Sequence, residues 1–432
     1  METSETALAF DELLDASALT DDDFLAVSQQ VYNPITSENG DTRKIKVKKL
    51  LDYILQKTNL ADLPGNAESI GKALVSKTEL PFFALSSPFI IANGRRTLTL
   101  KAGTKIDYGT GANKKVFLNS EDMELNVPTL LDTGYLQNGK DYYIFVCPGD
   151  TIKISLTKAA PLGMNAADVK LMAGFHTLCL GVNSGLTYVE GGVSKPHPLA
   201  GYAAGDILPN TVWCLNFRPH SEPEGMVYIP SLDFWCDIYL QSGSGVNTKS
   251  AYKAAPTLSR QYVDHVEDMI CVKKELLDDG EFAAAMMGSN EQTNIVNSNF
   301  PGDGVGGHSD TAGRRMISIY GVEEGCGWLW QWLRTTSVGG LYGQTYGQNS
   351  AQNVTPVTYG YLPASPGNMD QWYGQSEGKG QFLGLACALV AGGYWSDGAN
   401  CGSRSRYAGS SRSTARSSNG GRGRSRCVRA KI

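Results

Sequence analysis

Glycine constrains the fold of this chain more than any other residue, because 49 of its 432 residues are glycine and they run from residue 40 to residue 423. Only 19% of the residues are charged, whereas 41% are apolar. Long helices tolerate glycine poorly and carry more charge on their outer faces. The composition therefore predicts a β-rich α+β protein with many tight turns, and its apolar content is too high for global disorder.

The length predicts two or three domains. Residues 1–77 form the first unit, a small helical and extended segment in which Phe10, Leu13 and Leu14 indicate a short amphipathic helix. Leu50, Leu51, Ile54 and Leu55 repeat that spacing. Because this unit has little core of its own, we expect it to attach to a partner protein or to copies of itself.

Residues 78–195 read as strands separated by turns. Apolar and polar residues alternate over 97–101 and 151–157, and 142–146 is a continuous apolar run. Turn dipeptides such as Asn93-Gly94 and Asn138-Gly139 punctuate these runs. A β-sandwich of this length fits the pattern.

Residues 196–432 are mixed. Strands are expected at 234–240, 327–332 and 383–390, and helices at 261–271 and 281–287. Two long stretches, 288–313 and 337–380, are rich in small and polar residues and are expected to be loops. Long loops on a small set of regular elements usually carry function.

Nine cysteines cannot all pair with one another, and they show neither CxxC spacing nor a metal-ligand pattern, so we expect buried free thiols. The acidic N-terminus lacks the basic and apolar segments of a signal peptide, which indicates synthesis in the cytoplasm. No apolar run is long enough to span a membrane, so membrane insertion is not expected.

The sequence contains no recognisable catalytic constellation. HExxH and GxxxxGK[ST] are absent, and GxSxG occurs only as Gly374-Gln375-Ser376-Glu377-Gly378 inside the expected loop 337–380, so no enzyme activity, cofactor or metal is predicted. His176 is interpreted as structural. The run Gly302–Gly307 is interpreted as a flexible loop, and Asp278–Glu281 as a solvated helix start.

The C-terminal segment is strongly basic. Nine cations and no acid follow Asp397, which leaves about −14 on the rest of a chain whose net charge is −5. Such a segment is either a disordered Ser/Arg tail, a glycine-rich RNA-binding arm, or an ordered strand–loop–strand. An apolar strand and Trp395 lead directly into it and Cys427-Val428 follows it, which favours the ordered alternative.

Specific motifs in this segment carry a resemblance. Gly392-Gly393-x-Trp395, Gly402-Ser403-Arg404 and a closing Gly-x-Arg near 422–426 resemble the variable region of diversity-generating retroelement proteins, a family that includes phage tropism determinants. Earlier stretches such as 141–147, 215–219, 234–240 and 325–330 agree in order and rough spacing. The resemblance covers residue 78 to the end, whereas residues 1–77 do not follow the family pattern and look like a generic fibre or baseplate attachment segment.

The resemblance implies a C-terminal C-type lectin fold, of the kind shared with formylglycine-generating enzyme, over 196–432. It implies a homotrimer at the tip of a phage tail fibre in the virion, bound to a phage tail or baseplate protein through residues 1–77. A variable region at about 392–427 would bind a host cell-surface protein or polysaccharide receptor. Its scaffold would consist of Gly392, Gly393, Trp395, Gly402, Arg404, Arg422 and Arg424.

In this family adenine mutagenesis of Asn-type codons places Tyr, Ser, Asp, Gly and similar residues at the varied positions. Tyrosine gives a large contact area at low entropic cost, and small polar residues give adaptable hydrogen bonds. The arginines are assigned mostly to the scaffold, although some could steer the surface toward anionic polysaccharide. The ligand-binding slots expected here are Tyr394, Ser396, Asp397, Asn400, Ser405, Tyr407, Gly409, Ser410, Ser417, Ser418 and Asn419.

Three alternatives remain open at this point. One is a formylglycine-generating-enzyme-like oxidase, for which Cys401 and Cys427 are the only candidate reactive pair in the segment. Another is a bacterial surface lectin-like binding protein. The third is a nucleic-acid-binding arm, although binding to nucleic acid is not expected of an ordered loop.

Overall fold

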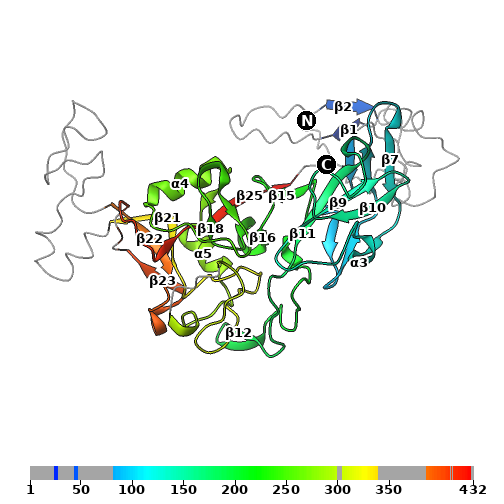
Figure 1. Ribbon diagram of the computed structural model, residues 1–432. Coiled ribbons are helices and arrows are strands. Elements are labelled where there is room, and N and C mark those ends of the chain that lie inside the picture. The colour runs from blue at the N-terminus through cyan, green and yellow to red at the C-terminus, as the bar shows by residue number, and fades with distance from the viewer. Residues whose placement is uncertain are drawn as a thin grey trace, which may run out of the picture.

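The computed structural model describes residues 24–27, 43–46, 81–298, 304–338, 386–408, 410 and 412–429. It has two lobes (Figure 1): one holds β7, β9, β10 and α3, and the other holds α4, α5 and β21 to β23. Strands β15 and β25 lie between the lobes. The predicted helix near Phe10 and the helical spacing near Leu50 lie outside the described residues.

Among the described residues, six smaller sheets accompany the main sheet, and all their pairings except that of β24 are antiparallel. Three of them are two-stranded: β1 (Phe24–Val27) with β2 (Arg43–Lys46), β12 (Thr187–Glu190) with β13 (Val193–Pro196), and β18 (Gln241–Ser242) with β19 (Lys249–Ser250). Two are three-stranded: β3 (Phe82–Ala84), β6 (Thr104–Tyr108) and β7 (Lys115–Asn119) in one, and β4 (Ile90–Ala92), β5 (Thr97–Leu100) and β8 (Met123–Asn126) in the other.

The main sheet has nine strands and continues from one lobe into the other. Its order is β10, β9, β11, β14, β15, β25, β17, β16, with β20 also paired to β25. The strands are β9 (Asp141–Cys147), β10 (Thr151–Ser155), β11 (Lys170–His176), β14 (Trp213–Cys214), β15 (Phe217–Pro219), β16 (Met226–Ile229), β17 (Phe234–Asp237), β20 (Glu275–Leu276) and β25 (Gly423–Arg429).

A four-stranded sheet completes the second lobe, in the order β23, β22, β21, β24. Its strands are β21 (Trp330–Val338), β22 (Ala386–Gly392), β23 (Gly402–Tyr407) and β24 (Asn419–Gly420). The α-helices of the described residues are α3 (Val127–Leu130), α4 (Tyr262–Cys271) and α5 (Asp279–Ala285). Short 3₁₀ turns are η4 (Gly111–Asn113), η5 (Ala166–Asp168), η6 (Pro209–Thr211), η7 (Pro230–Leu232), η8 (Gly245–Asn247), η9 (Val296–Ser298) and η11 (Gly398–Asn400).

Two large apolar cores stabilise the fold. The first lies between the three-stranded sheets and β9 to β11, and it includes Phe89, Leu98 and Phe145. The second lies under the four-stranded sheet and includes Phe282 and Trp328. Strand β9 is buried along almost its whole length, which explains why its sequence is a continuous apolar run and not an alternation.

The β-rich architecture with few helices is confirmed. Helix α4 follows its predicted range, and Gln261 caps it as part of a capping box. Helix α5 begins and ends two residues earlier than predicted, because Asp278 caps its N-terminus. The strand predicted over 234–240 stops at Asp237, and the one predicted over 327–332 begins at Trp330 and continues to Val338.

The main sheet continues across the expected domain boundary at residue 195. Strands β9, β10 and β11 precede it, and β14 and β15 extend the same sheet beyond it. The domain limits 1–77, 78–195 and 196–432 therefore remain predictions about folding units.

Candidate functional site

The segment after Asp397 is an ordered strand–loop–strand wherever the structure describes it. Strand β22 ends at Gly392, a turn leads through η11 into β23, and the chain returns through β24 to β25. Gly392 and Gly393 both have positive φ, 94° and 83°. A Cβ on Gly393 would lie 2.8 Å from the Cys401 sulfur and 3.0 Å from its Cα, so the two ends of the turn pack closer than any other residue allows.

Residues 289–298 hold this turn from outside. The backbone N–H of Gln292 donates to the carbonyl of Cys401 at 2.8 Å, and the Asn294 side chain donates to the carbonyl of Trp395. The Glu291 carboxylate accepts from the backbone N–H of Ser403 at 3.1 Å and from its hydroxyl. The sequence analysis did not predict these hydrogen bonds, because a polar stretch gives no local signal of the distant carbonyls to which it donates.

Two side chains near the end of β23 have different surroundings. Arg406 is paired with Asp279 of α5 and lies over the Phe282 ring, 4.9 Å from the centroid. Tyr407 is 47% exposed, and its ring lies 6.3 Å from that of Trp330. Arg404, which the sequence analysis assigned to the scaffold, is exposed. Arg406 makes the scaffold contacts that were expected of Arg404.

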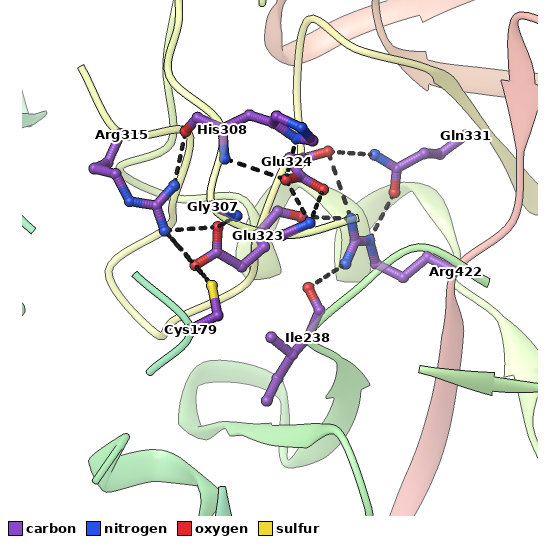
Figure 2. Close-up of polar contacts among 10 residues, drawn as sticks. Cys179, Ile238, Gly307, His308, Arg315, Glu323, Glu324, Gln331 and Arg422 are labelled. Carbon is purple, nitrogen blue, oxygen red and sulfur yellow. Dashed lines mark hydrogen bonds and ion pairs between the residues drawn. The ribbon is translucent and has the colours of Figure 1, made fainter. Parts of the chain in front are cut away.

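Arg422 is the most enclosed polar group of the site (Figure 2). It is fully buried, and its Nε donates to the Gln331 side chain at 2.8 Å. Its two terminal nitrogens donate to the carbonyls of Asp237, Ile238, Glu323 and Glu324. One guanidinium thus joins the ends of β17 and β21 to the segment that precedes β25.

A buried ionic cluster lies directly beside Arg422 (Figure 2). Arg315 pairs with Glu323 at 2.6 Å, and both side chains are almost completely buried. Glu324 accepts from the backbone N–H of Gly306 at 2.7 Å and from Nδ1 of His308 at 2.6 Å. Burial of charged side chains on this scale is tolerated when each has a partner, and each of these has one, although Nε of Arg315 is buried without a hydrogen-bond acceptor.

This cluster corrects the interpretation of the glycine run as a flexible loop. The described part of the glycine run, residues 304–307, is anchored and not flexible, because Glu323 and Glu324 accept its backbone N–H groups and Val305 is fully buried. The fold also brings histidines to carboxylates: His308 lies beside Glu324, and His176 lies 2.8 Å from Asp141. These pairs join residues that are far apart in the sequence.

The predicted helix start at Asp278–Glu281 is confirmed, with Asp279 and Gly280 exposed, but Glu281 is not solvated. Asp278 caps α5 by accepting from the backbone N–H of Glu281 at 2.7 Å. Glu281 itself is buried and binds Arg424 of β25 at 2.6 Å. The ion pair raises the pKa of Arg424, although burial opposes the change. Arg424 therefore contacts a carboxylate, as its scaffold assignment anticipates.

The expected slots occupy three kinds of environment. Those exposed to solvent are Ser396, Asn400, Tyr407 and Ser417. Those partly exposed are Tyr394, Asp397, Ser405 and Ser418. Ser410 and Asn419 are buried, the latter because it pairs with Trp330 in β24, so neither presents a side chain to a partner. Gly409 lies outside the described residues.

Trp395 lies in the turn that begins at the scaffold glycines Gly392 and Gly393. Tyr394 and Trp395 contact edge to face with centroids 5.1 Å apart, and the N–H of Trp395 donates to the carbonyl of Trp328 at 3.0 Å. Trp395 is half-buried against the second core, so the expected buried indole is only partly realised. Burial raises the pKa of Asp397, whose carboxylate accepts from the N–H of Tyr394.

The eight cysteines whose side chains are described are free thiols, as expected, but Cys271 is exposed and Cys427 is half-buried. Cys401 adjoins the four-stranded sheet, whereas Cys427 lies in β25 opposite Pro219. Burial raises the pKa of Cys401 to about 12 and also raises that of Cys427. Both thiols are therefore protonated at neutral pH, which makes them poor nucleophiles.

Among the described residues, no group of three or more metal-ligating side chains is close enough to hold an ion. In the same part of the chain, no helix is long and apolar enough to cross a membrane. In the described part of residues 392–427, a backbone held by hydrogen bonds carries several exposed or partly exposed side chains. Chemically, such an arrangement can bind a large partner through many contacts.

The chain is similar in sequence to known proteins. The family model described as Mtd second domain matches residues 88–214. The chain is 26% identical over 334 residues to the "Tail fiber receptor-binding protein" of Bordetella phage BPP-1, an alignment that covers 72% of this chain and 74% of the relative.

Solved structures show the same fold. The "Major Tropism Determinant U1 Variant" matches with a TM-score of 0.59 at 22% identity, over 81% of this chain and 86% of that one. The "Major Tropism Determinant I1 Variant" matches with a TM-score of 0.60 at 21% identity, over 82% and 88%. The β-rich fold is thus common to this chain and to these structures.

Proposed function

We propose that this protein is a receptor-binding protein of a phage tail fibre, and that residues 392–427 bind a receptor on the host cell surface. The observation that carries the proposal is the arrangement of that segment. Exposed side chains, Tyr407 among them, stand on a backbone that Glu291, Asn294 and Arg422 hold in place. Likeness to a tail fibre receptor-binding protein supports it.

A fixed backbone suits a surface whose side chains change. Arg422 and the Gly392–Gly393 turn are bonded to main-chain atoms or packed against them, so their contacts do not depend on which side chains fill the slots. We therefore propose that the segment is diversified by a retroelement at Tyr394, Ser396, Asp397, Asn400, Ser405, Tyr407, Ser417 and Ser418, within a C-type lectin-like fold. The buried Ser410 and Asn419 would be structural.

The remaining parts of the proposal concern assembly. The protein would be non-enzymatic, would sit in the virion at a fibre tip, and would attach through residues 1–77. A homotrimer would multiply weak single-site affinities through avidity. The thiols of Cys401 and Cys427, on different sheets and both with raised pKa values, argue against an oxidase that relies on a reactive cysteine pair.

An adsorption competition tests the function. Purified protein, added to host cells before phage, is expected to lower the adsorption rate in proportion to the cell sites that it occupies. The matched control carries Tyr394→Ala and Tyr407→Ala and should fail to compete while melting at a similar temperature. Competition by the double variant equal to that of the native chain would contradict the role of residues 392–427.

The nearby DNA tests the diversification. A near-copy of the codons for residues 392–427, differing mainly at adenines and close to a reverse-transcriptase gene, is expected. Its absence would leave a receptor-binding protein without diversification. Mass spectrometry of purified virions provides the assembly test, because a bacterial surface protein would be absent from the particles.

A further inference from the structure

Three aromatic rings and two arginines gather beside the predicted slots and form one surface, here called the aromatic–arginine patch (Tyr262, Trp330, Tyr407, Arg412 and Arg416). Tyr407 is exposed and lies against Trp330. The Arg412 guanidinium stands over the Tyr262 ring, 5.7 Å from its centroid. Arg416 is exposed, and its backbone carbonyl accepts from the N–H of Ser259, which precedes α4.

Backbone hydrogen bonds fix the members of the patch relative to one another. The N–H of Tyr262 donates to the carbonyl of Arg412 at 3.0 Å, and the N–H of Ser259 donates to that of Arg416 at 3.2 Å. The N–H of Trp330 donates to the carbonyl of Ser418 at 2.9 Å. Residues 412–418 therefore lie against the start of α4 and against β21, two elements that are neighbours in Figure 1.

Part of the positive charge of the C-terminal segment lies here, while Arg404 and Arg426 are exposed on β23 and β25. Arg422 is buried, and three other arginines face acids: Arg406 pairs with Asp279, Arg424 with Glu281 and Arg429 with Asp233. No Asp or Glu follows Asp397 to offset the remainder. Among the described cations of the segment, Arg412 stacks on an aromatic ring and Arg416 is open to solvent.

This combination fits one kind of polymer. Guanidinium groups bind carboxylates with paired hydrogen bonds, and flat aromatic rings offer apolar faces to the C–H faces of sugar rings. Tyr262, Trp330, Arg412 and Arg416 are not among the predicted slots, so this part of the surface is constant. A constant subsite is useful against a repeating polymer, because each repeat presents the same chemistry.

Building on the proposed function, we infer that the aromatic–arginine patch binds a carboxylate-bearing acidic polysaccharide of the host surface, while the neighbouring slots add discrimination. Its four members outside the slots, Tyr262, Trp330, Arg412 and Arg416, supply the contacts common to all variants of the protein. Tyr407 belongs to both sets, because it is a predicted slot that also completes the aromatic surface.

The test measures binding of the full chain to alginate, a polyuronate, with neutral dextran and poly-glutamate as comparison polymers. Tyr407→Ala is expected to weaken alginate binding about tenfold, whereas Tyr407→Phe, which keeps the ring, should change it less than about threefold. Arg416→Ala should weaken it roughly fivefold and flatten its salt dependence. Arg426→Ala removes the same charge from β25, where the side chain is 80% exposed, and should change binding less than about twofold.

Three results would overturn the inference. One is poly-glutamate binding as tightly as alginate, because charge alone or an acidic polypeptide would then explain the patch. Another is equal losses from Arg416→Ala and Arg426→Ala. The third is unchanged binding in Tyr407→Ala. Host-cell binding measured in parallel separates the two proposals: cell binding without alginate binding rejects only this inference, and alginate binding without cell binding rejects the receptor-binding function.

Discussion

Arg422 donates through Nε to the Gln331 side chain at 2.8 Å, although 91 residues separate the two in the sequence. The same guanidinium reaches four backbone carbonyls, so five acceptors depend on one buried side chain. Carbonyls from residues 237–238 and 323–324 converge on it. This makes Arg422 the link through which the segment after Asp397 is joined to the core of its lobe.

Arg422→Lys is expected to destabilise the protein by roughly 3–5 kcal/mol, because an ammonium cannot reach five acceptors and the rest would be buried without donors. Chemical denaturation measures the change. Arg426→Ala, at an exposed position of β25, serves as control and should fall within about 0.5 kcal/mol of the native protein. A loss below about 1 kcal/mol in Arg422→Lys would mean that the carbonyls find other partners.

Gly393→Ala should destabilise the turn that begins the candidate site. The new methyl group would meet the Cys401 sulfur at 2.8 Å and its Cα at 3.0 Å, in addition to the strain of a positive φ. Gly398→Ala is the matched control, because Gly398 also has positive φ but no atom within 4 Å of the added carbon. We expect a cost of about 1 kcal/mol for Gly398→Ala and roughly 2–4 kcal/mol for Gly393→Ala in denaturant titrations. Equal costs would refute the close approach.

Acid should destabilise the fold through buried histidines. Burial lowers the pKa of His265 from 6.5 to about 4, and Nδ1 bonds to the Gln241 side chain at 2.7 Å. Because the folded state disfavours the protonated ring, its contribution is complete above pH 6.5 and is lost as the pH falls toward 4. His197 behaves in the same way.

The measurement for this prediction is the unfolding free energy of native protein and His265→Gln between pH 8 and pH 4. The native protein should lose up to about 3 kcal/mol more than the variant over that interval. Parallel pH profiles for the two proteins would show that His265 does not titrate as its burial requires.

Thiol reactivity should follow exposure. Cys271 is exposed, whereas Cys147, Cys179, Cys214, Cys236 and Cys326 are buried. An alkylating reagent under native conditions should therefore label Cys271 first, Cys427 more slowly, and the buried thiols only after unfolding, as peptide mapping would detect. Rapid native labelling of Cys401 would be inconsistent with its burial and would reopen the question of a reactive cysteine.

The sequence was informative where local pattern decides structure. The spacing of apolar residues and the Gln261 cap predict α4, and the apolar run predicts β9. The predicted strand from Phe234 is wrong beyond Asp237, because the Asp237 carboxylate accepts from Lys274 and from the N–H of Gly423 and the chain turns there. Contacts with residues that distant leave no mark on a short sequence window.

The candidate site divides in the same way. The glycines of the turn could be placed from type and spacing, and the ordered course of the described part of 392–427 from its flanks, whereas the tyrosine and serine slots remain predictions. Three features could not be predicted, because each depends on which elements pack together. They are the hydrogen bonds from Ser403 to Glu291, the scaffold contacts of Arg406 in place of Arg404, and the burial of Ser410 and Asn419. Glu323 and Glu324 carry no motif, and only the fold brings Arg315, Gly306 and His308 to them.

Direct binding of labelled protein to host cells tests the central claim most simply. Four exposed slots, Ser396, Asn400, Tyr407 and Ser417, are replaced together by alanine, and the control carries Tyr135→Ala, a tyrosine 78% exposed on the other lobe. The account predicts that the fourfold variant loses cell binding by at least about a hundredfold while the control binds normally. Equal binding by the fourfold variant and the native protein would contradict it.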